Sequence, residues 1–145
     1  MPLEFQHASF LELALGVLLG SLIVSILLAL PLKLVAESIF KYPVRFVDAL
    51  KALLAAYLTL TALIIALVKL GAVDVVRTGS IALQIIGLAV GLVILAFSIA
   101  AFIRGPDGKR PDFAQSGVVA AIMQVMSLLI ALVLTTLDLP MNGRP

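Results

Sequence analysis

The sequence predicts an all-α membrane protein in which four transmembrane helices form two hairpins. Three observations predict this class. Hydrophobic residues make up 63% of the chain and charged residues only 12%, which lies outside the range of soluble globular proteins. Four apolar stretches are each long enough to cross a hydrocarbon core, which takes about 20 helical residues. The charged residues gather between those stretches, and a length of 145 residues predicts a single domain.

The first transmembrane helix is expected over about residues 9–32. The residues before it contain no Lys or Arg, so the positive region of a cleaved signal peptide is missing and we expect the span to be retained. Glu12 lies in the opening turn, where the helix dipole favours an acid, and a membrane-embedded proton or cation site is the alternative. Pro31 predicts a bend, after which residues 33–40 continue as an amphipathic helix along the membrane surface.

The other three transmembrane helices are expected over about residues 46–68, 80–103 and 113–137. The second and third are joined by a short loop. The third and fourth are joined by the polar segment RGPDGKRPD, whose two Pro and two Gly predict a turn. Its glycines lack the spacing of a phosphate-binding loop, so we do not expect nucleotide binding there.

The distribution of Lys and Arg predicts the orientation of the chain. Seven basic residues lie in or beside the first and third connections, and three lie on the other side of the membrane. The first group is Lys33, Lys41, Arg45, Lys51, Arg104, Lys109 and Arg110, and the second is Lys69, Arg77 and Arg144. Basic residues are enriched on the cytoplasmic side of membrane proteins. We therefore expect a cell (inner) membrane protein with both long connections in the cytoplasm and both termini outside it.

The connection between the first two spans is the part of the chain richest in basic and aromatic side chains. Its basic residues are Lys33, Lys41, Arg45 and Lys51, and they are interleaved with Phe40, Tyr42 and Phe46. Basic clusters beside a transmembrane helix attract anionic lipid head groups. This segment is therefore a candidate docking surface for anionic lipid or a partner subunit, and an ordinary juxtamembrane turn is the alternative.

Small residues are spaced for close helix packing in several spans. Gly16 and Gly20 lie four residues apart in the first span, Gly87 and Gly91 in the third, and Gly117 lies in the fourth. Lipid supplies no hydrophobic drive for helices to associate. Association must instead come from van der Waals contact between closely approaching backbones, which small residues permit. We expect these five glycines to be packing positions. The second span carries a similar stripe of Ala52, Ala55, Thr59, Ala62 and Ala66.

The two halves of the chain resemble each other. The matched positions are Gly16 with Gly87, Gly20 with Gly91 and Lys33 with Arg104, all 71 residues apart, and Phe46 with Phe113, 67 residues apart. These matches predict a duplicated helical hairpin over about residues 9–70 and 80–137. Two-span units keep one orientation in the membrane, so the repeats would be parallel. Chance matching between helices rich in small residues is the alternative.

Few polar side chains lie inside the predicted spans. Gln124 is nearest the middle of its span, Tyr57 lies at similar depth in the second, and Thr59 is close by. An amide paired with a hydroxyl across two helices would contribute about 1 kcal/mol to their association. The alternative is that these side chains line a pore or hold a polar ligand.

The sequence gives no support to catalysis. There is no Cys, and His7 is the only His, so neither a thiolate metal site nor a Ser-His-acid triad is expected. The basic residues form no contiguous face for nucleic acid. We therefore expect no catalytic residue, cofactor, metal or nucleic-acid partner, and not an enzyme.

The leading functional interpretation is a non-catalytic integral membrane subunit or scaffold. It would pack through its small-residue helix faces with itself, as a homo-oligomer, or with a larger membrane complex, and its other partners would be membrane lipids. One alternative is a small channel or carrier whose path forms between protomers. A second alternative is a protein that interacts with anionic lipids through the basic connection.

Overall fold

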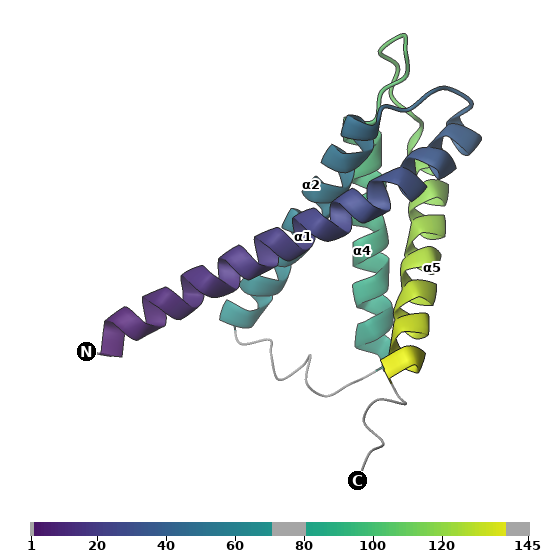
Figure 1. Ribbon diagram of the computed structural model, residues 1–145. Helices are drawn as coiled ribbons and strands as arrows, with labels where there is room; N and C mark the ends of the chain where they lie inside the picture. The colour runs from purple at the N-terminus through teal and green to yellow at the C-terminus, as the bar shows by residue number, and fades with distance from the viewer. Residues whose placement is uncertain (1, 71–80, 139–145) are drawn as a thin grey trace.

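The computed structural model describes residues 2–70 and 81–138, which form four helices (Figure 1). Helix α1 covers Pro2–Phe40, α2 covers Phe46–Lys69, α4 covers Ile81–Phe102 and α5 covers Phe113–Asp138. The segments long and apolar enough to cross a membrane are Ala14–Phe40, Phe46–Leu67, Ile81–Phe102 and Phe113–Thr136. The described part contains no strand. The predicted fold class, an all-α membrane protein with four transmembrane helices, is confirmed.

The helices are arranged as two antiparallel hairpins that pack side by side (Figure 1). Helix α1 packs on α2, α2 packs on α4 and α4 packs on α5, while a smaller contact between α1 and α5 closes the ring. The two described connections lie at the same end of the bundle. We call residues 41–45 the first elbow, residues 103–112 the second elbow, and this end the elbow end.

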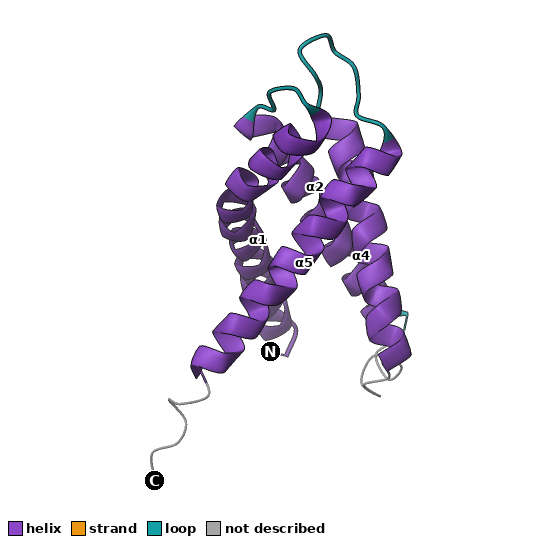
Figure 2. Cartoon of the chain, turned by 90° about the vertical axis from the view of Figure 1, so that its right-hand side faces the viewer, coloured by secondary structure: helices purple, strands orange, loops and turns teal. Residues whose placement is uncertain are grey.

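The buried core occupies only the half of the bundle nearest the elbows. Seven of its fifteen buried hydrophobic residues are alanines, which let the helix backbones approach closely. Away from the elbows the helices diverge (Figure 2), and nearly all their side chains are exposed. We call this part, residues 14–24, 58–69, 81–90 and 128–136, the open half. The buried hydrophobic residues are Ala29, Leu32, Ala36, Phe40, Val44, Ala49, Ala52, Leu53, Ala56, Ala96, Ile99, Ile103, Val119, Ala120 and Met123.

Helix α1 continues through Pro31 to Phe40 without a break. Proline removes one backbone donor and favours a break. One buried face nevertheless runs across it, formed by Ser25, Ala29, Leu32, Ala36 and Phe40 at spacings of three or four residues. Packing of this face against the other helices keeps the segment helical. Residues 33–40 therefore pack within the bundle, and the apolar segment of α1 that is long enough to cross a membrane extends to Phe40.

The other helix boundaries bear on the predicted repeat. Helices α2 and α5 begin at the matched residues Phe46 and Phe113. Lys33, in contrast, lies inside α1 and does not end it, while its match Arg104 follows the end of α4. The predicted start of the third span at residue 80 lies outside the described residues. The two hairpins thus correspond at the starts of their second helices but differ at the ends of their first.

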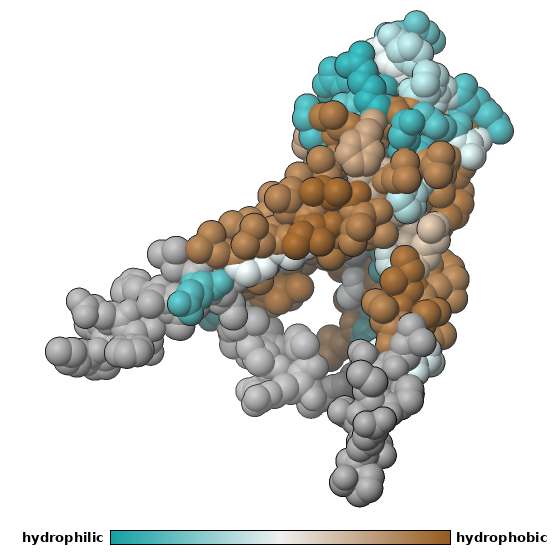
Figure 3. All heavy atoms as spheres, in the orientation of Figure 1, coloured by the Kyte–Doolittle hydropathy of each residue, from teal (hydrophilic) through white to brown (hydrophobic). Residues whose placement is uncertain are grey.

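The surface separates into a hydrophilic cap and apolar flanks. Figure 3 shows hydrophilic side chains gathered at the elbow end and hydrophobic side chains covering the helices below it. Leu27 in α1 is 69% exposed and Phe97 in α4 is 67% exposed, and both lie among these flanks. Such exposed apolar surface is the expected outer face of a helix bundle in lipid. Within the described residues the hydrophilic side chains thus concentrate at the elbow end.

Candidate functional site

The first elbow is organised by Glu37, in the last turns of α1. Its carboxylate oxygen Oε1 accepts a hydrogen bond from the Val44 backbone N–H at 3.0 Å and lies 3.5 Å from the Lys33 Nζ. The Glu37 carbonyl oxygen accepts a hydrogen bond from the Lys41 N–H at 3.1 Å. Lys41 has a φ of 62°, the left-handed conformation that often ends a helix. These interactions fix the path of the chain from α1 toward α2.

Helix α2 begins directly after the first elbow. The Arg45 carbonyl oxygen accepts hydrogen bonds from the N–H groups of Asp48 and Ala49, both at 3.1 Å. Arg45 therefore occupies the helix boundary, and Asp48 lies in the first turn, where the helix dipole favours an acid. Because its backbone belongs to the first hydrogen bonds of α2, the exposed Arg45 side chain projects from a defined position.

The second elbow contains a tight turn. The Gly108 N–H donates to the Gly105 carbonyl oxygen at 2.9 Å, and the Gly105 N–H donates to the Lys109 carbonyl oxygen at 2.9 Å. Pro106 occupies the second turn position, where its fixed φ is favourable. Gly108 has a φ of 74°, which glycine adopts without the strain that a side chain would add. The turn holds residues 103–112 compactly above the end of α4.

An aromatic contact joins the two elbows. The Tyr42 ring stacks on Phe40 with a centroid distance of 5.5 Å, and a Cβ built on Gly105 would lie 3.6 Å from the Tyr42 ring. The Tyr42 hydroxyl is buried and has no hydrogen-bond partner among the groups that the structure describes within residues 12–70 and 81–136. Burial raises the pKa of Tyr42, because desolvation disfavours the phenolate. The second elbow is thus held against the first by packing.

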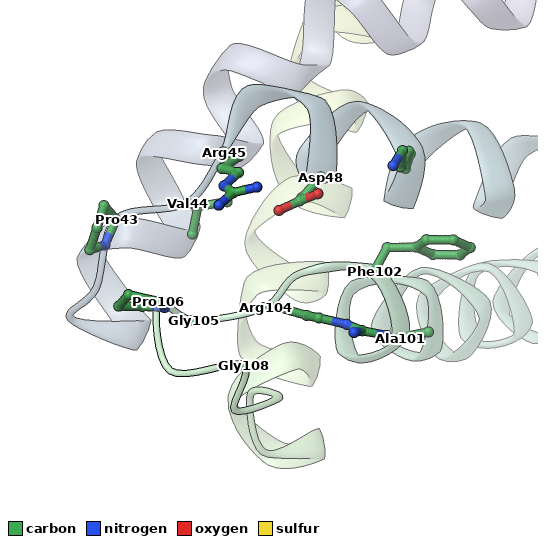
Figure 4. A pocket seen from close by; sticks show the side chains of 11 residues that line it. Pro43, Val44, Arg45, Asp48, Ala101, Phe102, Arg104, Gly105, Pro106 and Gly108 are labelled. Carbon is green, nitrogen blue, oxygen red and sulfur yellow. The ribbon is translucent and has the colours of Figure 1, made fainter.

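A pocket of about 770 Å³ lies between the elbows (Figure 4). Arg45, Asp48 and Lys51 line it from the first elbow and α2, and Arg104 lines it from the second elbow. Figure 4 shows Arg45 and Asp48 on one side and Arg104 on the other. Three cationic side chains and one carboxylate give the lining a formal charge of +2. We call this the elbow pocket.

The cations of the elbow pocket are not neutralised by ion pairs. Among the side chains that the structure describes within residues 12–70 and 81–136, the only salt bridge joins Lys33 to Glu37, outside the pocket. No carboxylate oxygen in that part of the chain therefore lies within 4 Å of a side-chain nitrogen of Arg45, Lys51 or Arg104. All three side chains are exposed. The arrangement can bind an anion between the two elbows.

The structure separates the four basic residues proposed from the sequence. Arg45 and Lys51 lie in the elbow pocket, Lys33 pairs with Glu37 on α1, and Lys41 is exposed without lining the pocket. Arg104 was missed as a site residue, because only the contact between the elbows places it across the pocket from Arg45. Its position at the end of the third span, on the same side of the membrane as the first elbow, was the available signal.

Two of the predicted intramembrane polar residues meet in the bundle interior. Tyr57 and Gln124 line a cavity of about 50 Å³, large enough for a few water molecules, although no hydrogen bond joins these two side chains. A Cβ built on Gly91 would lie 3.8 Å from the Gln124 Nε2, so Gly91 packs against that side chain. Thr59 is exposed, and its hydroxyl donates to the Ala55 carbonyl oxygen at 2.7 Å.

The other four predicted packing glycines face open space within the part of the chain that the structure describes. A Cβ built on Gly16, Gly20, Gly87 or Gly117 would find no heavy atom within 4 Å, leaving aside the adjoining residues and the local helix backbone. Gly16, Gly20 and Gly87 lie in the open half. The small-residue stripe of α2 shows the same change along its length, because Ala52 is buried whereas Thr59, Ala62 and Ala66 are exposed.

The described residues include no group of three or more His, Cys, Asp or Glu side chains placed to hold a metal ion. Comparison with known proteins finds no matching family model, no matching curated protein and no matching solved structure. The fold therefore defines the class, a membrane protein with four apolar helices, and the elbow pocket and the open half are the features from which a function must be argued.

Proposed function

We propose that the chain is a non-catalytic membrane scaffold that associates with a second copy of itself through the open half. The observation that carries this proposal is that Gly16, Gly20 and Gly87 face open space in the isolated chain. In the elbow half, small residues permit close helix contacts within the chain. In the open half, equally small residues lie on helices that have diverged. An additional helix can approach these glycines closely.

The chemistry of the open half favours a second copy as the partner. Gly16 and Gly20 lie one turn apart on one face of α1, the small-xxx-small spacing that lets two identical helices cross at short distance. A two-fold axis through such a crossing makes the surface its own complement. Because lipid and protein surfaces are both apolar, the hydrophobic effect does not drive this association. Dispersion between closely approaching backbones would supply the free energy of dimerisation.

The test adds bulk where the isolated chain leaves room. In Gly16→Ile/Gly20→Ile, side chains are added at positions with no neighbour within 4 Å, so the fold of a single chain is expected to be unchanged. The wild-type protein should be a dimer or larger oligomer in mild detergent and in bilayers. The double variant should be monomeric, as measured by light scattering and by energy transfer between labelled copies.

A matched control keeps the same helix but leaves the glycine face unchanged. Leu18 lies between the two glycines and is 49% exposed. Leu18→Ile conserves side-chain volume and should associate as the wild type does. A wild-type protein that stays monomeric in bilayers would overturn the proposal, and so would a Gly16→Ile/Gly20→Ile protein that associates as tightly as the wild type.

The orientation is part of the same proposal. Basic residues at the elbow end outnumber those on the other side, which supports a scaffold with both elbows in the cytoplasm. Arg77 and Arg144, which enter this comparison, lie outside the described residues. A reporter that is active only in the cytoplasm, fused to Pro145, should be inactive. An active fusion at this position would reverse the orientation.

A further inference from the structure

We propose that the elbow pocket binds the phosphate-bearing head group of an anionic phospholipid. This inference rests on the two elbows and the adjoining turns of α2 and α4, and it does not depend on self-association in the open half. Its basis is the convergence of Arg45, Lys51 and Arg104 around one pocket of about 770 Å³. Pockets that hold small ligands are typically about 300–1,000 Å³.

The charge of the elbow pocket defines the ligand as an anion. The fold places three cations from two hairpins together, and within the described residues none of them has a carboxylate oxygen within 4 Å. Arginine side chains present several N–H donors in a planar fork that fits phosphate oxygens, and lysine adds a compact positive charge. An anion bound between Arg45 and Arg104 would relieve the repulsion between the two elbows.

The position of the pocket favours a lipid over a soluble phosphate. It lies where the apolar spans end, between the first turns of α2 and the last turn of α4. Ala101 and Phe102 contribute an apolar wall, and Phe102 is 41% exposed. A phospholipid can place its phosphate against the cations while its acyl chains continue along the exposed apolar face of α4. A free phosphate would leave that wall unused.

Asp48 adds a preference among anionic lipids. It is the one carboxylate of the lining and lies beside Arg45 on α2 (Figure 4). A carboxylate repels a bare phosphate but accepts hydrogen bonds from hydroxyl groups. A head group with a hydroxyl next to its phosphate, such as glycerol, satisfies both the cations and Asp48. Phosphatidylglycerol is therefore the probe with which to test the pocket.

The experiment uses the full chain purified in mild detergent and titrated with phosphatidylglycerol or with zwitterionic phosphatidylcholine. Native mass spectrometry counts the bound lipid. The wild-type protein should retain phosphatidylglycerol about tenfold or more tightly than phosphatidylcholine, because each basic residue near an anionic lipid contributes about a factor of five. The variant Arg45→Gln/Lys51→Gln/Arg104→Gln should lose this preference.

The chain offers a control of equal charge. Lys41, Lys109 and Arg110 are exposed basic residues of the same elbows that do not line the pocket. The variant Lys41→Gln/Lys109→Gln/Arg110→Gln loses the same three charges, and it should keep most of the preference for phosphatidylglycerol. Asp48→Asn, which removes the negative charge from the pocket, should tighten binding of phosphatidic acid, a lipid whose phosphate carries no glycerol.

Three results would overturn the inference. Equal binding of phosphatidylglycerol and phosphatidylcholine by the wild type would show that the pocket does not select anions. Equal losses in the pocket variant and in the control variant would assign the effect to the general charge of the elbow end. Displacement of the lipid by millimolar inorganic phosphate would identify a soluble phosphate as the ligand. Circular dichroism should show unchanged helix content in both triple variants, because all six substituted side chains are exposed.

Discussion

Removal of the Glu37 carboxylate should destabilise the first elbow by an amount that the structure predicts. Glu37 makes two side-chain interactions, the hydrogen bond from the Val44 N–H at 3.0 Å and the ion pair with Lys33 at 3.5 Å. Val44 is only 2% exposed, so its N–H would have no ready replacement partner. A hydrogen bond to a charged group contributes about 1.5–3 kcal/mol. The partly exposed ion pair, between residues four apart on one helix, contributes about 0.3–0.5 kcal/mol.

Three substitutions separate these two interactions. Glu37→Leu removes both and should lower the free energy of unfolding by about 2–3 kcal/mol. Glu37→Gln keeps an oxygen that can accept from the Val44 N–H, and it should cost about 1 kcal/mol. Lys33→Met removes only the ion pair and should cost about 0.5 kcal/mol. The loss of stability should therefore be greatest for Glu37→Leu, smaller for Glu37→Gln and smallest for Lys33→Met, because of the two contacts that the Glu37 carboxylate makes.

The assay has a global and a local readout. Reversible unfolding in mixed micelles, followed by circular dichroism, gives the free energies. Hydrogen exchange at the Val44 amide reports the hydrogen bond itself, and Glu37→Leu should accelerate it about thirtyfold, the equivalent of about 2 kcal/mol. The reasoning is refuted if Glu37→Leu costs no more than Lys33→Met. It is also refuted if Glu37→Gln costs as much as Glu37→Leu, because the charge and not the acceptor would then be the stabilising feature.

Three further predictions concern single positions. Lys41→Gly should raise the free energy of unfolding by up to about 1 kcal/mol, because Lys41 has a φ of 62°, and an unchanged or lower stability would contradict this. In a Tyr57→Phe background, Tyr42 is the only tyrosine of the chain, and ultraviolet titration should show it ionising above the ordinary pKa of about 10. Since this pKa is raised by folding, the stability that Tyr42 contributes is complete below pH of about 10 and is lost as pH rises through the folded-state value. A midpoint at or below the ordinary value would refute the burial of its hydroxyl. Ile99→Ala should lower the free energy of unfolding by about 2 kcal/mol, because Ile99 is fully buried. The control Ile86→Ala, at a position 57% exposed, should lower it little. Equal losses of stability in the two variants would contradict a core confined to the elbow half.

The number and class of the helices follow from local sequence, whereas their ends depend on packing. Uninterrupted apolar runs predict helices because backbone groups in lipid must be hydrogen-bonded within the segment. Local preference favours a break at Pro31, yet α1 continues through this residue to Phe40. The buried face from Ser25 to Phe40 decides otherwise, and it can be recognised only when the other helices are in place.

The candidate site was predictable in part for a similar reason. Local composition identified the basic first elbow, and Arg45 and Lys51 do line the elbow pocket. The contribution of Arg104 depends on the Tyr42–Gly105 contact between two connections that lie about 60 residues apart in the chain. The sequence also predicted the same role, helix packing, for Gly16 and for Gly91. Whether a glycine meets a neighbour depends on where the helices diverge and, for Gly117 outside the open half, on which face of the helix it occupies. Spacing alone encodes neither.

The unequal lengths of the spans relate the shape of the bundle to bilayer thickness. The apolar segment of α1 has 27 residues, against 22 in α2 and in α4. At a rise of about 1.5 Å per residue it is about 40 Å long, which exceeds a hydrocarbon core of about 30 Å, and such an excess is accommodated by tilting, by bending or by local thickening of the bilayer. Figure 1 shows α1 crossing the other helices obliquely. A thinner bilayer would demand more tilt and a thicker one less. Gly16 and Gly20 lie on this segment, so the fit between α1 and the bilayer bears directly on the surface through which self-association is proposed.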